Sequence, residues 1–283
     1  MLSAEPVQRG NRARDGGTAG VEGAIEIQEI PPWPAQNRSH LYSGMLPVAP
    51  LIVHTALLAR LASPYPFVVG ETLRYDAKLG YFPVGEATVA VTRMAKERGK
   101  QSFVFTMAGQ GGPPGWRVRY DMTSWVGTGP FNSLRFHRRL EQGGKIDEHG
   151  YVIVPDSARY REEGVPGDWA APADPLDELA FLYYLRAAPL EVGQTYSLAR
   201  YFKTGYNPIE VSVTGRETIA MPGGATTPCL ALRVSARGST MRVWLTDDAR
   251  RLPAQLEIPL PFGSVTLSLV SSISPGNSRS PSG

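Results

Sequence analysis

Alternation of apolar and polar side chains with a period of two is the feature that most constrains the fold of this chain. In the stretch WRVRYDM, Trp116, Val118, Tyr120 and Met122 fall on one face of an extended segment, and the charged residues fall on the other. Successive side chains of a strand point to opposite faces, so the stretch predicts a strand with one packed and one wet face. Similar alternation occurs in EATVAVT, SFVFTM, SLRFH, TYSLARYF, IEVSVTG, CLALRVSA, MRVWLT, AQLEIPL and SVTLSLV. Gly, Pro or Asp separates these stretches, which predicts an antiparallel meander.

The segment DPLDELAFLYYLRAAPL breaks this pattern and predicts a helix. Asp174 can cap its start, Pro175 suits the first helical position, and Pro189 ends it. Asp177 and Glu178 complement the positive end of the helix dipole. The helix is apolar almost all round, which is typical of a buried helix.

A sheet that curls around this helix would bury it. The sequence therefore predicts a mainly β protein, in which an antiparallel open or half-closed β-barrel wraps one buried helix at about residues 174–188. If the barrel is hollow beside the helix, Phe181, Tyr184 and Leu185 are the expected apolar ligand contacts.

The composition divides the chain into four parts. Residues 1–44 are rich in Gly, Ala, Pro and charge without a sustained period, which predicts disorder. Residues 45–66 form an apolar segment, residues 67–275 a single β-barrel domain, and residues 276–283 a disordered tail. A Gly and Pro content above average agrees with many turns and short strands.

The apolar segment contains MLPVAPLIVHTALLA, from Met45, which has no acidic or basic residue. It is short and broken by proline for a membrane span, but it has the length of the apolar region of a secretory signal. We interpret it as a signal peptide, with a membrane anchor and a docked surface segment as the alternatives. Export would place the protein in the periplasm or cell envelope. Without export the protein would be cytoplasmic.

Charge and cysteine content argue against several classes of function. The formal net charge is +3, and the basic residues are scattered, so we do not expect nucleic-acid binding. The single cysteine, Cys229, lies in an alternating stretch and is expected to be a buried thiol. The four histidines are far apart in the sequence, so neither a metal site nor a cofactor is expected.

Two adjacent aspartates, Asp247 and Asp248, raise the question of acid and base catalysis. They lie in DDARR, between two stretches that read as strands. Asp is favoured in hairpin loops because its side chain accepts hydrogen bonds from the nearby backbone. Catalytic carboxylate pairs normally come from separate segments with different environments. We therefore interpret both residues as a structural turn, and a contact to a partner or ion is the alternative.

Other catalytic motifs are missing from the sequence. The stretch GQGGPPG lacks the Lys-Ser/Thr ending of a phosphate-binding loop, and no Gly-x-Ser-x-Gly stretch occurs. His137 has no carboxylate and serine at a spacing that suggests a triad. No catalytic residues are predicted, and the protein is not expected to be an enzyme.

Strand phase also predicts a basic face. If Val118 and Tyr120 point inward, then Arg117 and Arg119 point outward, and the same rule sends Arg135 and His137 outward on a neighbouring strand. A solvated face balanced by acidic residues is one interpretation. Binding of a lipid headgroup or an acidic envelope polymer, with peripheral membrane contact, is the other.

Several stretches together resemble the bacterial family called domain of unknown function 3108. They are FVVGETLRYDAKLGYFPVGEATV, LDELAFLYYLR, PLEVGQTY and VWLTDDARRLPAQLEIPLPFGSV. The resemblance covers about residues 67–274 and implies an envelope protein. Its architecture is similar to that of periplasmic lipoprotein carriers, in which an open barrel wraps a helix beside an apolar concavity. No catalytic residues are established for the family.

These observations lead to three hypotheses about function. The first is an exported, non-catalytic protein that binds an apolar or amphipathic ligand, such as a lipid or lipoprotein moiety, in the concavity of the barrel. The second is a structural or assembly protein of the envelope, whose barrel is filled by its own side chains. The third is a hydrolase with a site that the sequence does not reveal.

Overall fold

One continuous β-sheet accounts for most of the described residues. The computed structural model describes residues 27–28, 65–112, 117–221, 224–260 and 263–275. The strands are β1 (Ile27–Gln28), β2 (Thr72–Leu79), β3 (Phe82–Glu97), β4 (Lys100–Gly111), β5 (Val118–Gly127), β6 (Ser133–Gln142), β7 (Lys145–Val154), β8 (Arg159–Glu162), β9 (Trp169–Ala170), β10 (Thr195–Leu198), β11 (Ile209–Ala220), β12 (Thr226–Ala236), β13 (Ser239–Thr246), β14 (Pro253–Leu260) and β15 (Gly263–Ile273). The helix α1 is Glu178–Ala187, and η1 (Pro155–Ser157) and η2 (Thr204–Tyr206) are short 3-10 helices.

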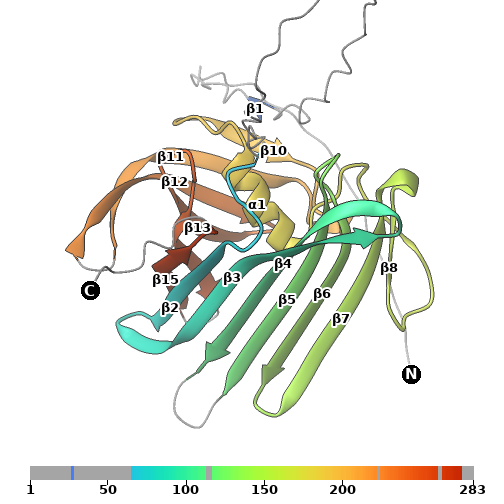
Figure 1. Cartoon of the computed structure of the whole chain (residues 1–283), viewed down its shortest axis with the longest axis horizontal. Coiled ribbons are helices and arrows are strands. Elements are labelled where there is room, and N and C mark those ends of the chain that lie inside the picture. The colour runs from blue at the N-terminus through green and yellow to red at the C-terminus, as the bar shows by residue number, and fades with distance from the viewer. Residues whose placement is uncertain (1–26, 29–64, 113–116, 222–223, 261–262, 276–283) are drawn as a thin grey trace, which may run out of the picture.

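The sheet is an open barrel. Its strand order is β1-β10-β11-β12-β13-β14-β15-β2-β3-β4-β5-β6-β7-β8-β9. The pairing of β15 with β2 joins a wall formed by β2 to β9 to a wall formed by β10 to β15. All described pairs are antiparallel except that of β1 with β10, and the two edge strands of the sheet do not pair with each other. The predicted mainly β, half-closed barrel around one helix is therefore confirmed (Figure 1).

Alternation along the strands separates the two faces of the sheet. In β2, Leu73, Tyr75 and Ala77 are buried, whereas Arg74 and Asp76 are exposed. The buried residues point to the concave face and join one large apolar cluster that also contains the residues of α1. Cys229 is buried as expected, in a small separate cluster on the convex face.

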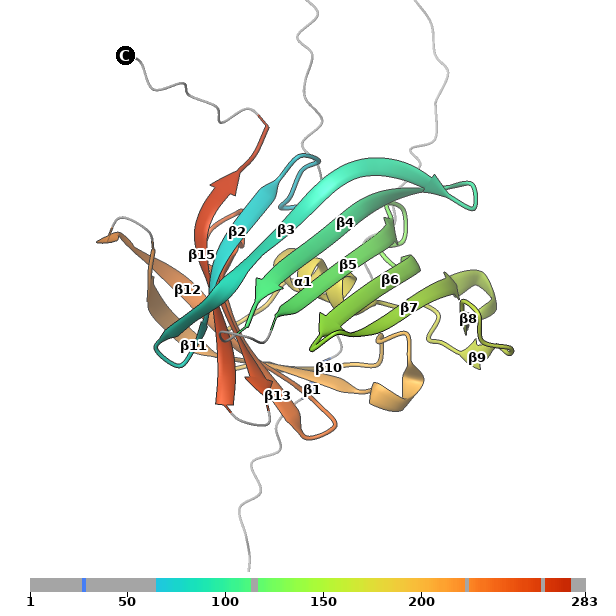
Figure 2. The same cartoon turned by 90° about the horizontal axis from the view of Figure 1, so that it is seen from below.

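The helix α1 packs inside the curve of the sheet. Figure 2 shows α1 between the wall of β3 to β6 and the wall of β10 to β13. The ring of Tyr183 stacks on that of Phe105 in β4, with ring centroids 3.8 Å apart. Since both rings are buried, this contact fixes the helix against the first wall.

The start of the helix differs from the prediction. Asp177, and not Asp174, is the N-cap, because its side chain accepts hydrogen bonds from the backbone N–H groups of Leu179 and Ala180. The residues before it are extended: the N–H of Leu176 donates to the carbonyl of Arg200 at 2.6 Å. This pairing with a distant segment overrides the local helix signal of Pro175.

The first wall has two distinct ends. Gly85, Gly111, Val118, Gln142 and Lys145 pair in turn with one another and form a row across β3 to β7. We call the edge next to this row, with the turns between β2 and β3 and between β6 and β7, the hairpin end. Figure 1 shows these turns on the lower side of the molecule and α1 on the upper side.

Several sequence predictions lie outside the described residues. They are the predicted disordered extension of residues 1–44 apart from Ile27–Gln28, most of the apolar segment of residues 45–66, the tail of residues 276–283 and the orientation of Trp116. Within the part that the structure describes, no helix has the length and apolar character needed to cross a membrane.

Candidate functional site

The interior beside α1 is filled by side chains. Phe181, Tyr184 and Leu185, the predicted ligand contacts, have 7%, 8% and 1% of their surface exposed. All three belong to the large apolar cluster. They therefore contribute to the packed core of the barrel, and a ligand contact by any of them stays a prediction.

Towards the hairpin end the concave face becomes partly exposed. Several inward-facing apolar side chains there are only half-buried, although they pack against the same cluster. We call them the apolar lining. They are Val84, Met107 and Tyr120 on the first wall and Met241, Ile258 and Val265 on the second wall. Solvent reaches this lining, in contrast to the interior beside α1.

An arginine points into the same face. Arg138 has the strand phase of buried Phe136 and half-buried Leu140, so its side chain points to the concave side. Its guanidinium Nη2 lies 3.4 Å from an oxygen of Asp147, and the arginine side chain is 32% exposed. This ion pair is longer than a typical charge-assisted hydrogen bond of about 2.8 Å. Arg138 is thus a half-buried cation with Tyr120, Asp147 and Glu178 around it.

A carboxylate from the helix lies close to this arginine. Glu178, the first residue of α1, accepts a hydrogen bond at 2.7 Å from the hydroxyl of Tyr201. Its other oxygen, Oε2, and Nε of Arg138 are both buried without a hydrogen-bond partner. Burial raises the pKa of the Tyr120 hydroxyl, and the negative charge of Glu178 raises it further. The tyrosines therefore stay neutral beside the two charges.

A histidine network lies next to this group on β7. His149 bonds through Nε2 to Asp147 at 2.7 Å and through Nδ1 to Glu162. The ring of His149 stacks on that of Tyr151, with centroids 5.9 Å apart. We call Tyr120, Arg138, His149, Glu178 and Tyr201 the charged cluster.

The arrangement suits an amphipathic molecule. Ligand sites are typically apolar surfaces with a few polar groups that fix orientation. Here the apolar lining adjoins a cluster in which one buried donor and one buried acceptor have no partner. Such unpartnered groups are costly, so a polar group or water that satisfies them stabilises the site.

The predicted basic face lies on the convex side of β5 and β6, away from this site. Arg119 forms an ion pair with Asp121 at 2.9 Å, and Arg135 with Glu163 at 3.0 Å. On β6, the residue opposite Arg119 in the strand ladder is Glu141. Glu141 lies six residues from Arg135, which places Arg119 and Arg135 about 20 Å apart. The two arginines therefore share a face but do not meet.

The remaining members of this face are placed as follows. His137 lies 3.0 Å from Glu148, which also pairs with Arg139 at 3.5 Å. Arg117 is exposed and has no ion pair among the described residues. Acidic side chains thus balance most of the face, which favours the interpretation as a solvated surface.

Asp247 and Asp248 lie in the loop between β13 and β14. Oδ1 of Asp248 accepts hydrogen bonds from the backbone N–H groups of Arg250 and Arg251 at 2.9 and 3.0 Å. Asp247 forms an ion pair at 2.7 Å with Arg216 on β11. The two carboxylates thus have separate partners, one in the loop itself and one on β11, two strands from β13.

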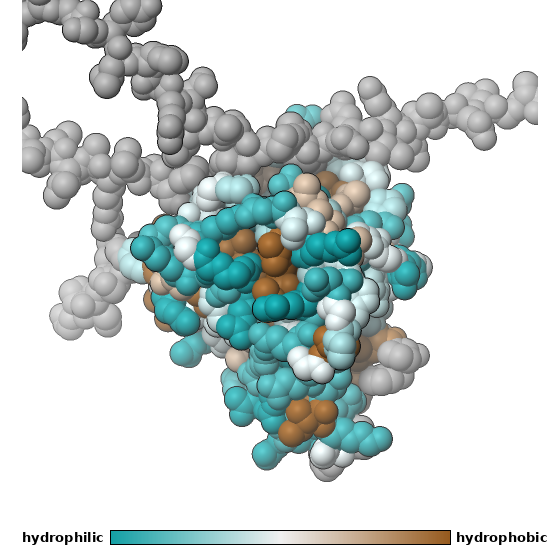
Figure 3. Space-filling model, turned by 90° about the vertical axis from the view of Figure 1, so that its right-hand side faces the viewer, coloured by the Kyte–Doolittle hydropathy of each residue, from teal (hydrophilic) through white to brown (hydrophobic). Residues whose placement is uncertain are grey.

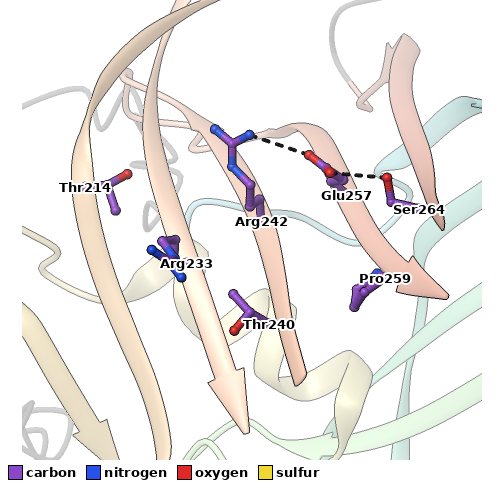
Figure 4. Close-up of a pocket in the computed structure, with 7 residues that line it drawn as sticks. All are labelled: Thr214, Arg233, Thr240, Arg242, Glu257, Pro259 and Ser264. Atoms are coloured by element: carbon purple, nitrogen blue, oxygen red, sulfur yellow. Dashed lines mark hydrogen bonds and ion pairs between the residues drawn. The ribbon is translucent and has the colours of Figure 1, made fainter. Parts of the chain in front are cut away.

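A polar groove of about 460 Å³ lies on the convex face of the second wall. Figure 4 shows its lining residues, which are Thr214, Arg233, Thr240, Arg242, Glu257, Pro259 and Ser264. Arg242 is close to Glu257 at 3.6 Å and to Glu217 at 3.3 Å, so its charge is compensated. The groove thus lies on the opposite face of the sheet from the apolar lining, and Arg242 in it has acidic partners.

The sequence reasoning missed the charged cluster. Its members come from β5, β6, β7, α1 and the segment before η2, which no linear spacing connects. One signal was present in the sequence. The phase rule that placed Arg135 and His137 outward also places Arg138 inward, at a position where a charge is unusual.

Comparison with solved structures supports the fold. The crystal structure of a beta-barrel-like protein of domain of unknown function DUF1849 from Brucella abortus matches with a TM-score of 0.50 and 9% identity, covering 73% of this chain and 98% of that chain. A second match, with a TM-score of 0.33 and 11% identity, covers 74% of this chain and 98% of the other. It is a protein with a YmcC-like fold from Bacteroides fragilis NCTC 9343, described as a candidate exported protein.

Comparison of sequences gives the family. No curated protein matches this chain. The family model described as "Protein of unknown function (DUF3108)" matches residues 74–270, which include every strand from β3 to β14. Since this match spans most of the chain, the protein belongs to the DUF3108 family.

Proposed function

We propose that this protein binds an amphipathic small molecule on its concave face and catalyses no reaction on it. The observation that carries the proposal is the change in burial along that face. Apolar side chains are fully buried beside α1 and only half-buried in the apolar lining. An apolar surface that a folded protein leaves open inside a concave sheet is typical of a binding site.

The charged cluster would receive the polar end of the ligand. Arg138 is partly exposed and forms a long ion pair with Asp147, and Tyr120 and Glu178 interact with it from β5 and α1. A group that both donates and accepts hydrogen bonds could satisfy both residues. The acyl or other apolar part would then lie along the apolar lining, between the two walls.

The proposed setting is the bacterial cell envelope. The apolar run from Met45 is consistent with a secretory signal. A lipid or a lipoprotein moiety is the class of amphipathic ligand that this setting supplies.

The second candidate function is a structural or assembly role without a small ligand. The burial of Phe181, Tyr184 and Leu185 in a filled core favours this alternative. It differs from the first proposal in one measurable respect, because a structural protein would leave the apolar lining free of bound molecules.

Mass spectrometry of the purified protein tests the proposed function. The full chain is purified without detergent and extracted with organic solvent, and the extract is analysed for amphipathic molecules. We expect one class of molecule at a stoichiometry near one per chain. An unrelated protein that is purified in parallel serves as the control, and an extract no richer than that control would favour the structural alternative.

A further inference from the structure

The hairpin end carries the most exposed apolar side chains of the described residues. Tyr81, in the turn between β2 and β3, and Phe82, the first residue of β3, are 98% and 75% exposed. A buried or half-buried position is usual for aromatic side chains of this size. Two neighbouring rings that project fully into solvent therefore suggest a surface that is covered in the working protein.

A second apolar side chain lies at the other corner of this end. Ile146, which follows the turn between β6 and β7, is 56% exposed. Along the row of paired residues, β7 is four strands away from β3. At about 4.8 Å per strand, Ile146 therefore lies about 20 Å from the start of β3. Figure 3 shows an isolated hydrophobic patch among hydrophilic residues at the lower tip of the sheet.

Basic residues accompany these apolar side chains. Lys78 and Lys145 are exposed and form no ion pair within the described residues. Residues 78–84 and 142–146 contain no aspartate or glutamate. The nearest acidic residues of β7, Asp147 and Glu148, already pair with His149 and His137. The two turns of the hairpin end thus combine exposed apolar side chains with two lysines that have no described ion pair, while Asp76, Glu86 and Glu141 lie just behind the turns.

We propose that the hairpin end docks on an anionic lipid bilayer. Aromatic side chains favour the interface between headgroups and acyl chains, and nearby lysines are attracted to anionic headgroups. The apolar lining reaches this end, since Val84 lies two residues after Phe82 at the start of β3. Resting on the proposed function, this docking would let an amphipathic ligand pass between the membrane and the concave face.

Vesicle flotation of the full chain tests the docking. Binding is compared between vesicles of phosphatidylcholine alone and vesicles that also contain phosphatidylglycerol. The double variant Tyr81→Ser and Phe82→Ser should lose about tenfold or more in binding to both, because it removes two aromatic contacts with the interface. The double variant Val68→Ser and Val192→Ser is the matched control.

The control residues lie in the segments before β2 and after α1, away from the hairpin end, and are 41% and 42% exposed. Their replacement should leave vesicle binding within about twofold of the wild type. Circular dichroism of each variant checks that the fold is intact. A control variant that weakens binding as much as the Tyr81 and Phe82 variant would overturn the proposal.

The charge contribution is tested separately. The double variant Lys78→Gln and Lys145→Gln should reduce the preference for vesicles that contain phosphatidylglycerol, and high salt should remove the difference from wild type. No binding of the wild-type chain to either vesicle would contradict docking. Equal binding of the Tyr81 and Phe82 variant would point to another surface or to a protein partner.

Failure of the docking is distinguishable from failure of the proposed function. Binding of the fluorescent fatty acid dansyl-undecanoic acid is measured in solution without vesicles. The hairpin-end variants should bind this probe like the wild type, because the apolar lining is unchanged. Loss of vesicle binding with normal probe binding supports docking, whereas a wild type that does not bind the probe contradicts the proposed function alone.

Discussion

Arg186 and Glu71 form a bidentate ion pair inside the protein. Nη1 and Nη2 of Arg186 donate to the two carboxylate oxygens of Glu71 at 2.6 and 3.1 Å. Their side chains are only 1% and 2% exposed. Nη2 also reaches the carbonyls of Pro66 and Arg250. The pair therefore joins the last turn of α1 to the segment before β2 and to the loop between β13 and β14.

Removing one member of this pair should be strongly destabilising. Arg186→Met leaves the buried Glu71 carboxylate with only Arg250, 3.9 Å away, as a cation, and loss of one partner of a buried pair costs about 3–5 kcal/mol. Urea denaturation of the wild type and the variant measures this change in the free energy of unfolding. The double variant with Glu71→Leu should recover part of the loss. A single variant within about 0.5 kcal/mol of the wild type would show that the pair does not fix the helix.

Asp177 should make stability depend on pH. Burial raises the pKa of its carboxyl from 3.8 to about 6, although Ser124, Ser133 and the helix N–H groups donate hydrogen bonds to it. The folded state therefore binds the proton more tightly than the unfolded state does. The stability from this group is fully present below the unfolded pKa and is lost as pH rises through about 6.

The variant Asp177→Asn removes this titration and keeps an oxygen that can accept from the helix N–H groups. Relative to the variant, the wild type should lose about 3 kcal/mol of unfolding free energy between about pH 3.5 and pH 7, since each pKa unit corresponds to about 1.4 kcal/mol. Urea denaturation at several pH values gives this difference directly. A wild type that gains on the variant as pH rises would contradict the assignment.

The two adjacent aspartates should differ in their effect on stability. Asp248→Ala removes an acceptor for two backbone N–H groups and should cost about 1 kcal/mol or more. Asp247→Ala removes only an ion pair with Arg216, whose side chain is 62% exposed, and should cost less. Thermal unfolding of both variants makes the comparison. If Asp247→Ala proves the more destabilising, the loop has another organisation.

The period of two was sufficient to predict the fold class, because one wet and one packed face leave few architectures for so many strands. The start of α1 could not be predicted from local signals. Leu176 joins a bridge to Tyr201, which lies far along the chain, and this tertiary pairing keeps Pro175 out of the helix. Asp177 was then the next residue with a side chain able to cap the helix.

The paired arginines of the convex face should contribute little. Arg119→Ala with Arg135→Ala removes two exposed arginines that already have carboxylate partners. We expect a change in unfolding free energy of about 1 kcal/mol or less for each pair, and vesicle binding within about twofold of the wild type. Denaturation and flotation measure the two effects. A loss of anionic vesicle binding equal to that of the Lys78 and Lys145 variant would restore the convex face as an anion-binding surface.

The candidate site was harder to predict than the fold for a related reason. Arg138 and Glu178 are near each other only because the sheet curves around the helix, and nothing in their sequence positions indicates that curvature. The apolar lining differs from the core in its exposure alone. Val265 and Leu267 have the same strand phase and similar chemistry, yet only Leu267 is fully buried.

The most direct test of the account is the affinity for dansyl-undecanoic acid when the apolar lining is filled. Met107→Trp places a large ring on the half-buried concave face, whereas Met94→Trp adds the same ring at a position that is 43% exposed. Fluorescence titration of the wild type and both variants gives the dissociation constants. We predict that Met107→Trp raises the dissociation constant about tenfold or more, because the ring occupies space that the acyl chain would fill, and that Met94→Trp leaves it unchanged. Equal affinities for all three proteins, or a wild type that does not bind the probe, would contradict binding on the concave face.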